Sequence, residues 1–220
     1  MNQLDKTIIR NLVMHYFRVS ELTGEPTSNL DITDDGVVNF RGNISYDGLG
    51  GSLQELPVQF GEIGGNFLCA AAGLTTLLGS PHKVGNTFDC SANKLNSFQY
   101  GPIDVGGSFT CRNNHSHIPN LIGVPNFCDQ LDVTNRIGGI GLESLDGLPS
   151  PANVNHINIS IKINDCPILR LLKYSSFNII SNSELNQIMH KYMNQRPLRP
   201  AILQCQKELI DAGFEGNATL

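Results

Sequence analysis

Three successive stretches of the sequence share one pattern: GGNFLCAAAGLTTLLGSP at residues 64–81, GNTFDCSANKLNSFQYGP at 85–102 and GGSFTCRNNHSHIPNLIGVP at 106–125. Each stretch has a cysteine two positions after a phenylalanine, and the cysteines lie 21 residues apart at Cys69, Cys90 and Cys111. Self-similarity at a period of about 20 to 29 residues is typical of leucine-rich-type solenoids, in which each repeat supplies one short strand and one return loop. The spacing therefore predicts a short solenoid.

The centre of each repeat alternates apolar and polar residues, as in Phe88-Asp89-Cys90. Successive side chains of a strand point to opposite faces, so we expect the phenylalanines and cysteines to stack inward between neighbouring coils. The core positions predicted in this way are Phe67, Cys69, Phe88, Cys90, Phe109 and Cys111. A dry stack of this kind favours reduced, buried thiols.

The segment after each strand carries the signals of a bend. Asn93 and Asn114 lie three positions after a column cysteine, where a leucine-rich repeat uses an asparagine side chain to satisfy backbone groups, and Ala72 takes this position in the first repeat. Apolar residues also recur seven and four positions before a proline, in the sets Leu74, Leu77 and Pro81; Leu95, Phe98 and Pro102; Ile118, Leu121 and Pro125; Leu142, Leu145 and Pro149. The later sets are spaced by 23 and 24 residues, which predicts insertions in the bends. We expect the last strand at residues 157–161, where the solenoid fades.

Both ends of the chain carry helical patterns that suit caps, which a solenoid needs to cover its apolar cross-sections. Residues 3–19 predict one helix, which ends before Gly24. Ser183 is a plausible N-cap for a second helix, and a third is expected from Pro200 to Gly213. The predicted organisation is an α+β fold in one structural unit, with a helical cap at 1–35, a repeat solenoid at 36–165 and a second helical cap at 166–220.

The three repeats resemble the G-G-x-F-x-C-x-x-N-x-L-T-S-L-x-G-x-P repeats of leucine-rich-repeat-like proteins carried by tailed bacteriophages and some bacteria. The flanks LPVQFGEIGGNF (56–67) and CQKELIDAGFEGNATL (205–220) are also similar to those of the phage proteins, so the resemblance covers patches of residues 35–220. It implies a leucine-rich-repeat-like β-solenoid and a small intracellular phage product that contacts a host or phage protein. It brings no catalytic residues to this sequence.

Composition and charge exclude several other classes of protein. The formal charge of −5 and the pI of about 5.6 disfavour a nucleic-acid partner, since phosphate contacts need clustered lysines and arginines. No run of about 18 or more apolar residues predicts a membrane span, and the N-terminus lacks a cleavage signal, so we expect a cytoplasmic protein, in the host cell if the chain is phage-encoded.

For the cysteines, histidines and clustered aspartates, the sequence favours structural roles over metal-binding or catalytic roles. Cys111 with His115 and His117 forms a C-x3-H-x-H string, but its cysteine is expected to face the core and four converging ligands are not visible. The acidic cluster Asp31, Asp34 and Asp35 favours a solvated turn over a cation site. The remaining cysteines are predicted to be reduced and packed; they are Cys128, Cys166 and Cys205. Because no phosphate-binding loop, nucleophile elbow or zinc-protease motif occurs, we expect no enzyme, no metal and no cofactor.

The alternation also predicts a surface for a protein partner, on the side of the strands that faces away from the core. The candidate residues are Asn66, Leu68, Thr87, Asp89, Ser91, Ser108, Thr110 and Arg112. The leading hypothesis is a non-enzymatic protein-binding solenoid that contacts or inhibits a host protein. A virion-associated structural protein is the first alternative, and a small-ligand binder or unrecognised enzyme is the second. The oligomeric state and the identity of the partner stay open.

Overall fold

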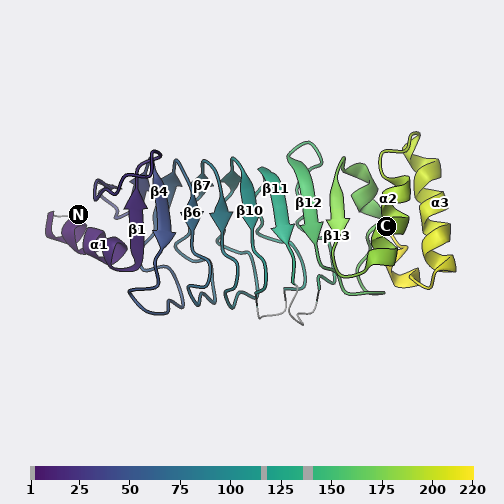
Figure 1. The fold of residues 1–220 in the computed structure, drawn as a ribbon, viewed down its shortest axis with the longest axis horizontal. Coiled ribbons are helices and arrows are strands. Elements are labelled where there is room, and N and C mark those ends of the chain that lie inside the picture. The colour runs from purple at the N-terminus through teal and green to yellow at the C-terminus, as the bar shows by residue number, and fades with distance from the viewer. Residues whose placement is uncertain (1–2, 115–117, 136–140) are drawn as a thin grey trace.

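The computed structural model describes residues 3–114, 118–135 and 141–220. Over these ranges the chain winds into a β-solenoid of about six turns (Figure 1). Helix α1 (Gln3–Tyr16) lies at one end, and helices α2 (Ser183–Tyr192) and α3 (Leu198–Asp211) lie at the other. The solenoid predicted from the 21-residue spacing is confirmed, with helices at both of its ends.

The turns build two sheets, whereas the sequence predicted one strand per repeat. Sheet A contains, in spatial order, β1 (Phe17–Ser20), β4 (Asn43–Tyr46), β6 (Phe67–Leu68), β8 (Phe88–Asp89), β10 (Ser108–Thr110), β11 (Cys128–Val133), β12 (Val154–Ile159) and β13 (Phe177–Ile179). Sheet B contains β2 (Asp31–Ile32), β3 (Val38–Phe40), β5 (Phe60–Ile63), β7 (Lys83–Val84) and β9 (Asp104–Val105). Neighbouring strands are parallel, except β1 with β4 and β2 with β3. The strands of sheet B in the repeats span only two residues each, which is too short for a periodic signal in the sequence.

A glycine column forms the corner between the two sheets. A Cβ atom on Gly85 would lie 2.0 Å from the carbonyl oxygen of Gly64 in the preceding coil, and one on Gly106 would lie 2.2 Å from that of Gly85. No side chain fits between coils this close, so the corner requires glycine at residues 85 and 106.

The phenylalanines of the repeats form an inward column. The ring centroids of Phe67 and Phe88 are 5.7 Å apart, those of Phe88 and Phe109 are 5.5 Å apart, and both pairs are stacked nearly parallel. The strand register extends this column through Leu131, Ile157 and Phe177, and it extends the cysteine column through Val133, Ile159 and Ile179. The expectation that the solenoid fades at 157–161 is therefore wrong. Apolar residues of other types take the places of phenylalanine and cysteine, and the sheet continues to β13.

Asn93 lies fully buried at the bend and joins two neighbouring coils. Its side-chain oxygen accepts hydrogen bonds from the backbone N–H groups of Gly73 and Leu74, at 2.8 and 3.0 Å. Its side-chain nitrogen donates to the backbone oxygens of Cys69 and Cys90, at 2.9 and 3.0 Å. The one amide thus bonds to four backbone groups that the bend buries.

Asn114 takes the same position one coil later. Its side-chain oxygen accepts from the backbone N–H of Leu95 at 3.0 Å, and its nitrogen lies 3.3 Å from the backbone oxygen of Cys90. Asn135, a further 21 residues along, donates to the backbone oxygen of Asn114 at 3.1 Å. Asn135 lies two positions after Val133 of the cysteine column, not three, so it adds one hydrogen bond to this bend without taking the position of Asn93 and Asn114.

A hydroxyl or amide side chain in each coil also fixes the outer part of the bend. At this position a side-chain oxygen accepts a hydrogen bond from the backbone N–H two residues later, at 3.0 to 3.2 Å. The residues are Thr76, Ser97, Asn120 and Ser144. Such local turns are a common role of these residue types, and here they lie five positions before each proline.

The helix at the N-terminal end is shorter than predicted. Helix α1 ends at Tyr16, and Phe17 begins strand β1, in which Phe17 and Val19 are buried while Arg18 is exposed. The helix packs on the core through Val13, which is fully buried. The alternating burial of residues 17–19 explains the difference, because a strand at the sheet edge buries two apolar side chains that a longer helix would separate.

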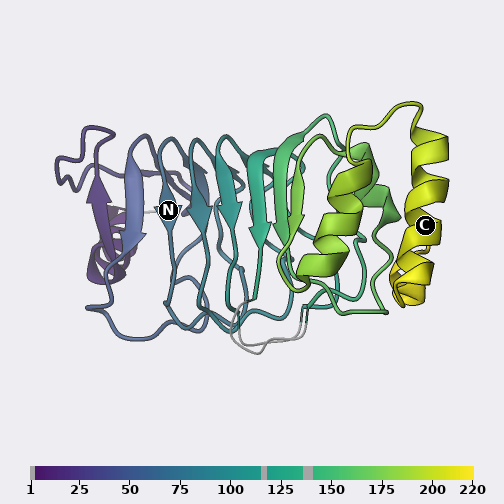
Figure 2. The same cartoon turned by 45° about the vertical axis from the view of Figure 1, so that its right-hand side comes forward.

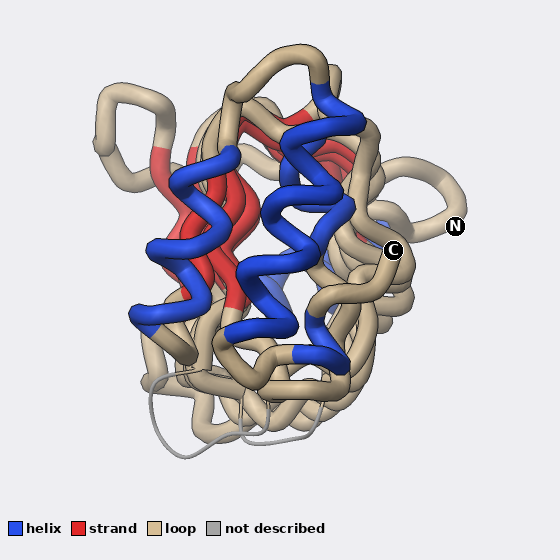
Figure 3. Tube along the Cα trace, turned by 90° about the vertical axis from the view of Figure 1, so that its right-hand side faces the viewer, coloured by secondary structure: helices blue, strands red, loops and turns tan. Residues whose placement is uncertain are grey.

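At the C-terminal end, the segment predicted as a helical cap from residue 166 first completes one more coil. It forms the 3-10 helix η1 (Leu169–Lys173) and strand β13 before helix α2 begins. The N-cap of α2 is Asn182, whose side chain accepts from the backbone N–H of Leu185, so the prediction of Ser183 was wrong by one residue. Helix α2 packs against both β13 and α3, and the two helices lie side by side across this end of the solenoid (Figures 2 and 3).

The last turn, η2 (Glu215–Asn217), fastens the tail to the solenoid. Asn217 is fully buried. Its side chain accepts from the backbone N–H of Asn164 and donates to the backbone oxygen of Cys166, both at 2.8 Å.

Candidate partner-binding face

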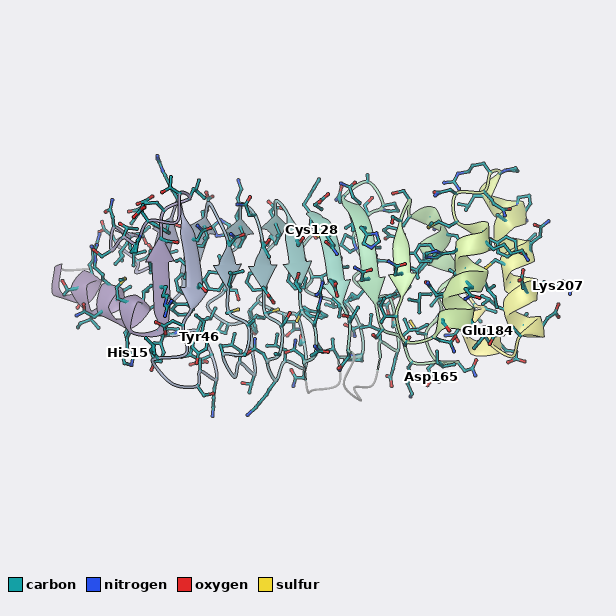
Figure 4. The ribbon with its side chains drawn as sticks, in the orientation of Figure 1. His15, Tyr46, Cys128, Asp165, Glu184 and Lys207 are labelled. Atoms are coloured by element: carbon teal, nitrogen blue, oxygen red, sulfur yellow. The ribbon has the colours of Figure 1, made fainter. Side chains whose placement is uncertain are left out.

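The predicted partner face lies on the outward side of sheet A. Seven of its residues are half-buried, and Arg112 is exposed; the seven are Asn66, Leu68, Thr87, Asp89, Ser91, Ser108 and Thr110. The parallel register places Leu68 beside Asp89 and Asp89 beside Thr110, so these residues form one row across β6, β8 and β10. Figure 4 shows the side chains of this face along the length of the sheet.

The register continues the row onto three strands that the sequence reading did not include. Thr110 pairs with Asp132, Asp132 with Asn158, and Asn158 with Asn178. The signal that could have found them is a triplet with apolar ends and a polar centre, which recurs as Leu131-Asp132-Val133, Ile157-Asn158-Ile159 and Phe177-Asn178-Ile179.

Asp132 is the centre of a hydrogen-bonded group on this extended face. Its side chain is only 4% exposed and lies 2.6 Å from Nη2 of Arg112. The hydroxyl of Thr134 donates to Oδ1 of Asp132 at 2.9 Å, and the amide nitrogen of Asn158 lies 3.4 Å from its Oδ2. The hydrogen bond to Asp132 raises the pKa of the Arg112 guanidinium, which stays charged at every physiological pH.

The same group fixes the orientation of His156. A carboxylate only accepts hydrogen bonds, so the nitrogen of the Asn158 amide faces Asp132 and its oxygen faces His156. Nε2 of His156 lies 3.0 Å from that oxygen and 3.3 Å from the amide nitrogen of Asn178, and Nδ1 lies 2.6 Å from the hydroxyl of Ser176. In the neutral tautomer with the proton on Nε2, Nε2 donates to the Asn158 oxygen and Nδ1 accepts from Ser176. Asn178 also donates to the Asn158 oxygen, at 3.0 Å.

We call this connected group the polar ladder; it consists of Arg112, Asp132, Thr134, His156, Asn158, Ser176 and Asn178. Each member is held by its neighbours, so a partner that binds here orders few side chains. The arrangement therefore suits recognition of polar groups on another molecule.

The structure describes the predicted column of cysteines but not the two histidines of the C-x3-H-x-H string. The column cysteines Cys69, Cys90 and Cys111 are free and buried, and burial raises the pKa of the Cys69 and Cys90 thiols well above its usual value. His115 and His117 lie outside the described residues.

The aspartates of the predicted acidic cluster near the N-terminus contact different partners. Asp34 forms an ion pair of 2.9 Å with Lys6, and the Thr33 hydroxyl donates to Asp35 at 2.5 Å. Over residues 3–114, 118–135 and 141–220, no three histidine, cysteine or acidic side chains are grouped so that they would hold a metal ion.

An open groove of about 1040 Å³ lies over sheet B near the N-terminal end. Its lining mixes acidic, basic and amide side chains, among them Asp31, Asn39, Arg41, Glu62, His82 and Lys83. His82 lies 3.6 Å from Glu62 at the lining. Among the residues described, none of the helices combines the length and apolar character that crossing a bilayer requires.

Comparisons of the chain with protein-family models, with curated proteins and with solved structures found no significant match.

Proposed function

We propose that this chain is a non-enzymatic protein-binding solenoid that engages its partner through the outward face of sheet A. The observation that carries the proposal is the polar ladder, a row of side chains locked by one another on the outward face of the sheet. Solenoids present such a face as an extended binding surface, because the inward columns carry the fold and leave the outward positions free to vary.

The resemblance of the repeats to phage leucine-rich-repeat-like proteins supports a more specific form of the proposal. In that form the chain is a leucine-rich-repeat-like phage product that acts in the host cytoplasm on a host protein. The repeat motif and its 21-residue spacing are the support for this step.

The test is affinity capture from phage-infected host cells with the full-length chain as bait. Thr87→Arg and Thr110→Arg place bulky charges on half-buried outward positions, and each is expected to abolish capture of any partner of the face. Asn96→Arg, an exposed position on the bend, serves as the matched control and should retain capture. Equal capture by all three variants would remove sheet A from the proposal.

A virion-associated structural role is the first alternative, and detection of the chain in purified particles would favour it. An enzyme is the second, and one contact supports it. The Ser176 hydroxyl lies 2.6 Å from Nδ1 of His156, the spacing of a nucleophile and its base. Labelling of Ser176 by a serine-reactive phosphonate, lost in His156→Gln and absent from neighbouring Ser175, would establish that role.

A further inference from the structure

Within the described chain, β13 is the last strand of sheet A, and its outer edge faces the C-terminal helices. Each strand from β4 to β12 is bonded on this edge to the strand of the next coil. In β12 the backbone N–H of Ile157 donates to the next coil at 3.2 Å, and the backbone oxygen of Ile159 accepts from it at 2.9 Å. The register pairs Phe177 with Ile157 and Ile179 with Ile159. The backbone groups of Phe177 and Ile179 therefore face the place where a further strand would lie.

Two side chains of helix α2 take the place of that strand. Oδ1 of Asn186 accepts from the backbone N–H of Ile179 at 2.8 Å, as a backbone carbonyl of the next coil would. Nε2 of His190 lies 2.6 Å from the backbone oxygen of Phe177. A carbonyl oxygen only accepts hydrogen bonds, so Nε2 carries a proton and replaces a backbone N–H. Helix α2 thus supplies both an acceptor and a donor to the edge (Figure 2).

A third side chain continues the row. Asn194 lies two residues beyond the end of α2, and its Nδ2 donates to the backbone oxygen of Ser175 at 3.2 Å. The three side chains are four residues apart in the sequence and bond to alternate residues of the segment 175–179. Four helical residues rise about 6 Å and two strand residues rise about 6.6 Å, so the two spacings match. We call Asn186, His190 and Asn194 the edge latch.

The imidazole of the edge latch also covers the last ring of the phenylalanine column. The rings of Phe177 and His190 meet edge to face, with their centroids 5.3 Å apart. Phe177 is buried, and the buried side chains of α2 pack against the same end of the solenoid. The latch therefore closes the hydrogen-bonding edge and the apolar column of the last coil together.

The opposite end of sheet A is closed in a different way. The backbone N–H of Thr27 donates to the oxygen of Val19 on β1 at 3.0 Å, and Ser20 pairs with Pro26 in antiparallel register. The backbone of the chain itself thus covers that edge. At β13 the bonds come from side chains, so substitutions can remove them while the backbone of the solenoid stays in place. An uncovered edge presents unpaired N–H and C=O groups, which are a template for pairing with another chain.

We propose that the edge latch occupies a strand-addition site on β13, and that a second copy of this chain pairs with the same edge when the latch is removed. A twofold axis would place the two β13 strands antiparallel, so that donors of one edge face acceptors of the other. Buried Phe177 and Ile179 alternate with half-buried Asn178 on both strands, so apolar side chains align with apolar ones. The latch bonds lie along the edge of the sheet and are independent of the partner proposed for its outward face.

Hydrogen exchange of the full-length chain tests the latch itself. In Asn186→Ala the N–H of Ile179 loses its acceptor, so its exchange should become at least about tenfold faster. The N–H of Ile157, which donates to β13 from one coil earlier, should keep its rate. Gln187→Ala removes an exposed amide from the same helix and should change neither rate. An unchanged rate at Ile179, or equal acceleration at both positions, would overturn the proposal.

Sedimentation velocity tests the pairing with a second copy. Asn186→Ala/His190→Ala leaves one bond of the latch, so its sedimentation coefficient should rise from the monomer to the dimer value as the concentration increases. The native chain and Gln187→Ala should keep one value. Adding Ile180→Lys, at a position 42% exposed beside β13, places a charge at the edge and should abolish the association. A double variant that stays monomeric, or that associates equally well with Ile180→Lys, would contradict the proposal.

Discussion

Arg112 and Asp132 form an ion pair of 2.6 Å between adjacent coils on the outward side of sheet A, although the aspartate side chain is only 4% exposed. A carboxylate with so little solvent contact is stable only where other groups replace the water. Arg112 supplies the charge, and Thr134 and Asn158 supply the hydrogen bonds. The pair is therefore the anchor of the polar ladder as well as part of the candidate partner face.

Replacing the arginine tests this anchor. We expect Arg112→Met to lower the free energy of unfolding by about 1 to 3 kcal/mol, less than for a fully buried pair because Arg112 itself is 45% exposed. The measurement is a urea unfolding midpoint. Lys207→Met is the control, since the ion pair of Lys207 with Asp211 is exposed on both sides and should contribute little to the free energy of unfolding. Similar midpoints for the two variants would show that Asp132 does not depend on Arg112.

This dependence also changes the choice of variants for binding experiments. Charge reversal at Arg112 places a second carboxylate beside Asp132, so a loss of binding would be mixed with a loss of stability. The sequence alone makes Arg112 an isolated surface charge. Thr87 and Thr110 are cleaner probes of the face.

The buried asparagines of the bends, Asn93 and Asn114, make a graded prediction. Asn93→Ala should destabilise the protein by about 1 to 3 kcal/mol, because it removes one hydrogen bond from the backbone groups of four residues. Asn114→Ala should cost less within the same range, since Asn114 makes fewer and longer bonds to the backbone. Urea midpoints decide the order, with exposed Asn96→Ala as the control. If both asparagine variants have the urea midpoint of the native chain, the amide side chains are not the required partners of the buried backbone groups in the bend.

The sequence predicts the inward columns because stacked coils repeat the same environment at a fixed spacing. Phe88 and Cys90 recur with their equivalents every 21 residues, and each lies in register with its neighbour. The repeat motif does not predict the column in the later coils, because Leu131 and Ile157 keep the apolar character of the column but not its residue type. A core position constrains the volume and polarity of its side chain more strongly than the residue type. The sequence motif therefore ends before the solenoid does.

The candidate face is harder to predict than the core. Its residues interact between coils, as Asp132 does with Arg112 and as Ser176 does with His156, 20 residues apart in each pair. Such contacts become visible only once the register of the strands is known, since a shift of one residue would turn each side chain to the other face. The edge latch likewise becomes visible only once helix α2 is placed beside β13.

The buried thiols predict how stability depends on pH. Burial raises the pKa of Cys69 and Cys90 well above the usual value of 9.0, and it raises the pKa of Cys128 to about 12. Above pH 9 the thiols ionise in the unfolded state but stay protonated in the folded state. The free energy of unfolding therefore decreases as the pH rises. Stability is therefore complete below pH 9 and falls between pH 9 and 12, by at most about 1.4 kcal/mol per pH unit for each thiol.

Urea midpoints at pH 8 and pH 10 measure this effect, and Cys90→Ala should show a smaller fall than the native chain. The same burial predicts slow reaction of these thiols with a maleimide in the native protein and fast reaction in urea, because the thiolate is the reactive form. Rapid native labelling of Cys69 and Cys90, or a native midpoint that is unchanged at pH 10, would contradict the account.

Removal of the C-terminal end tests whether helix α3 closes the solenoid. Helix α3 buries Ala201, Cys205 and Leu209, and the tail beyond it places Asn217 in hydrogen bonds with the preceding coil. A chain that ends at Pro197 leaves uncovered the apolar surface that these residues contact, so we expect a lower melting temperature and aggregation. Asn217→Ala should produce a smaller loss of about 1 to 3 kcal/mol without aggregation, because it strands two backbone groups but leaves the helix in place. Leu203→Ser, on the exposed side of α3, should melt with the native chain. Sedimentation and thermal melting distinguish the cases, and a monomeric truncated chain that melts like the full-length protein would mean that the solenoid ends at β13 and α2 without needing α3.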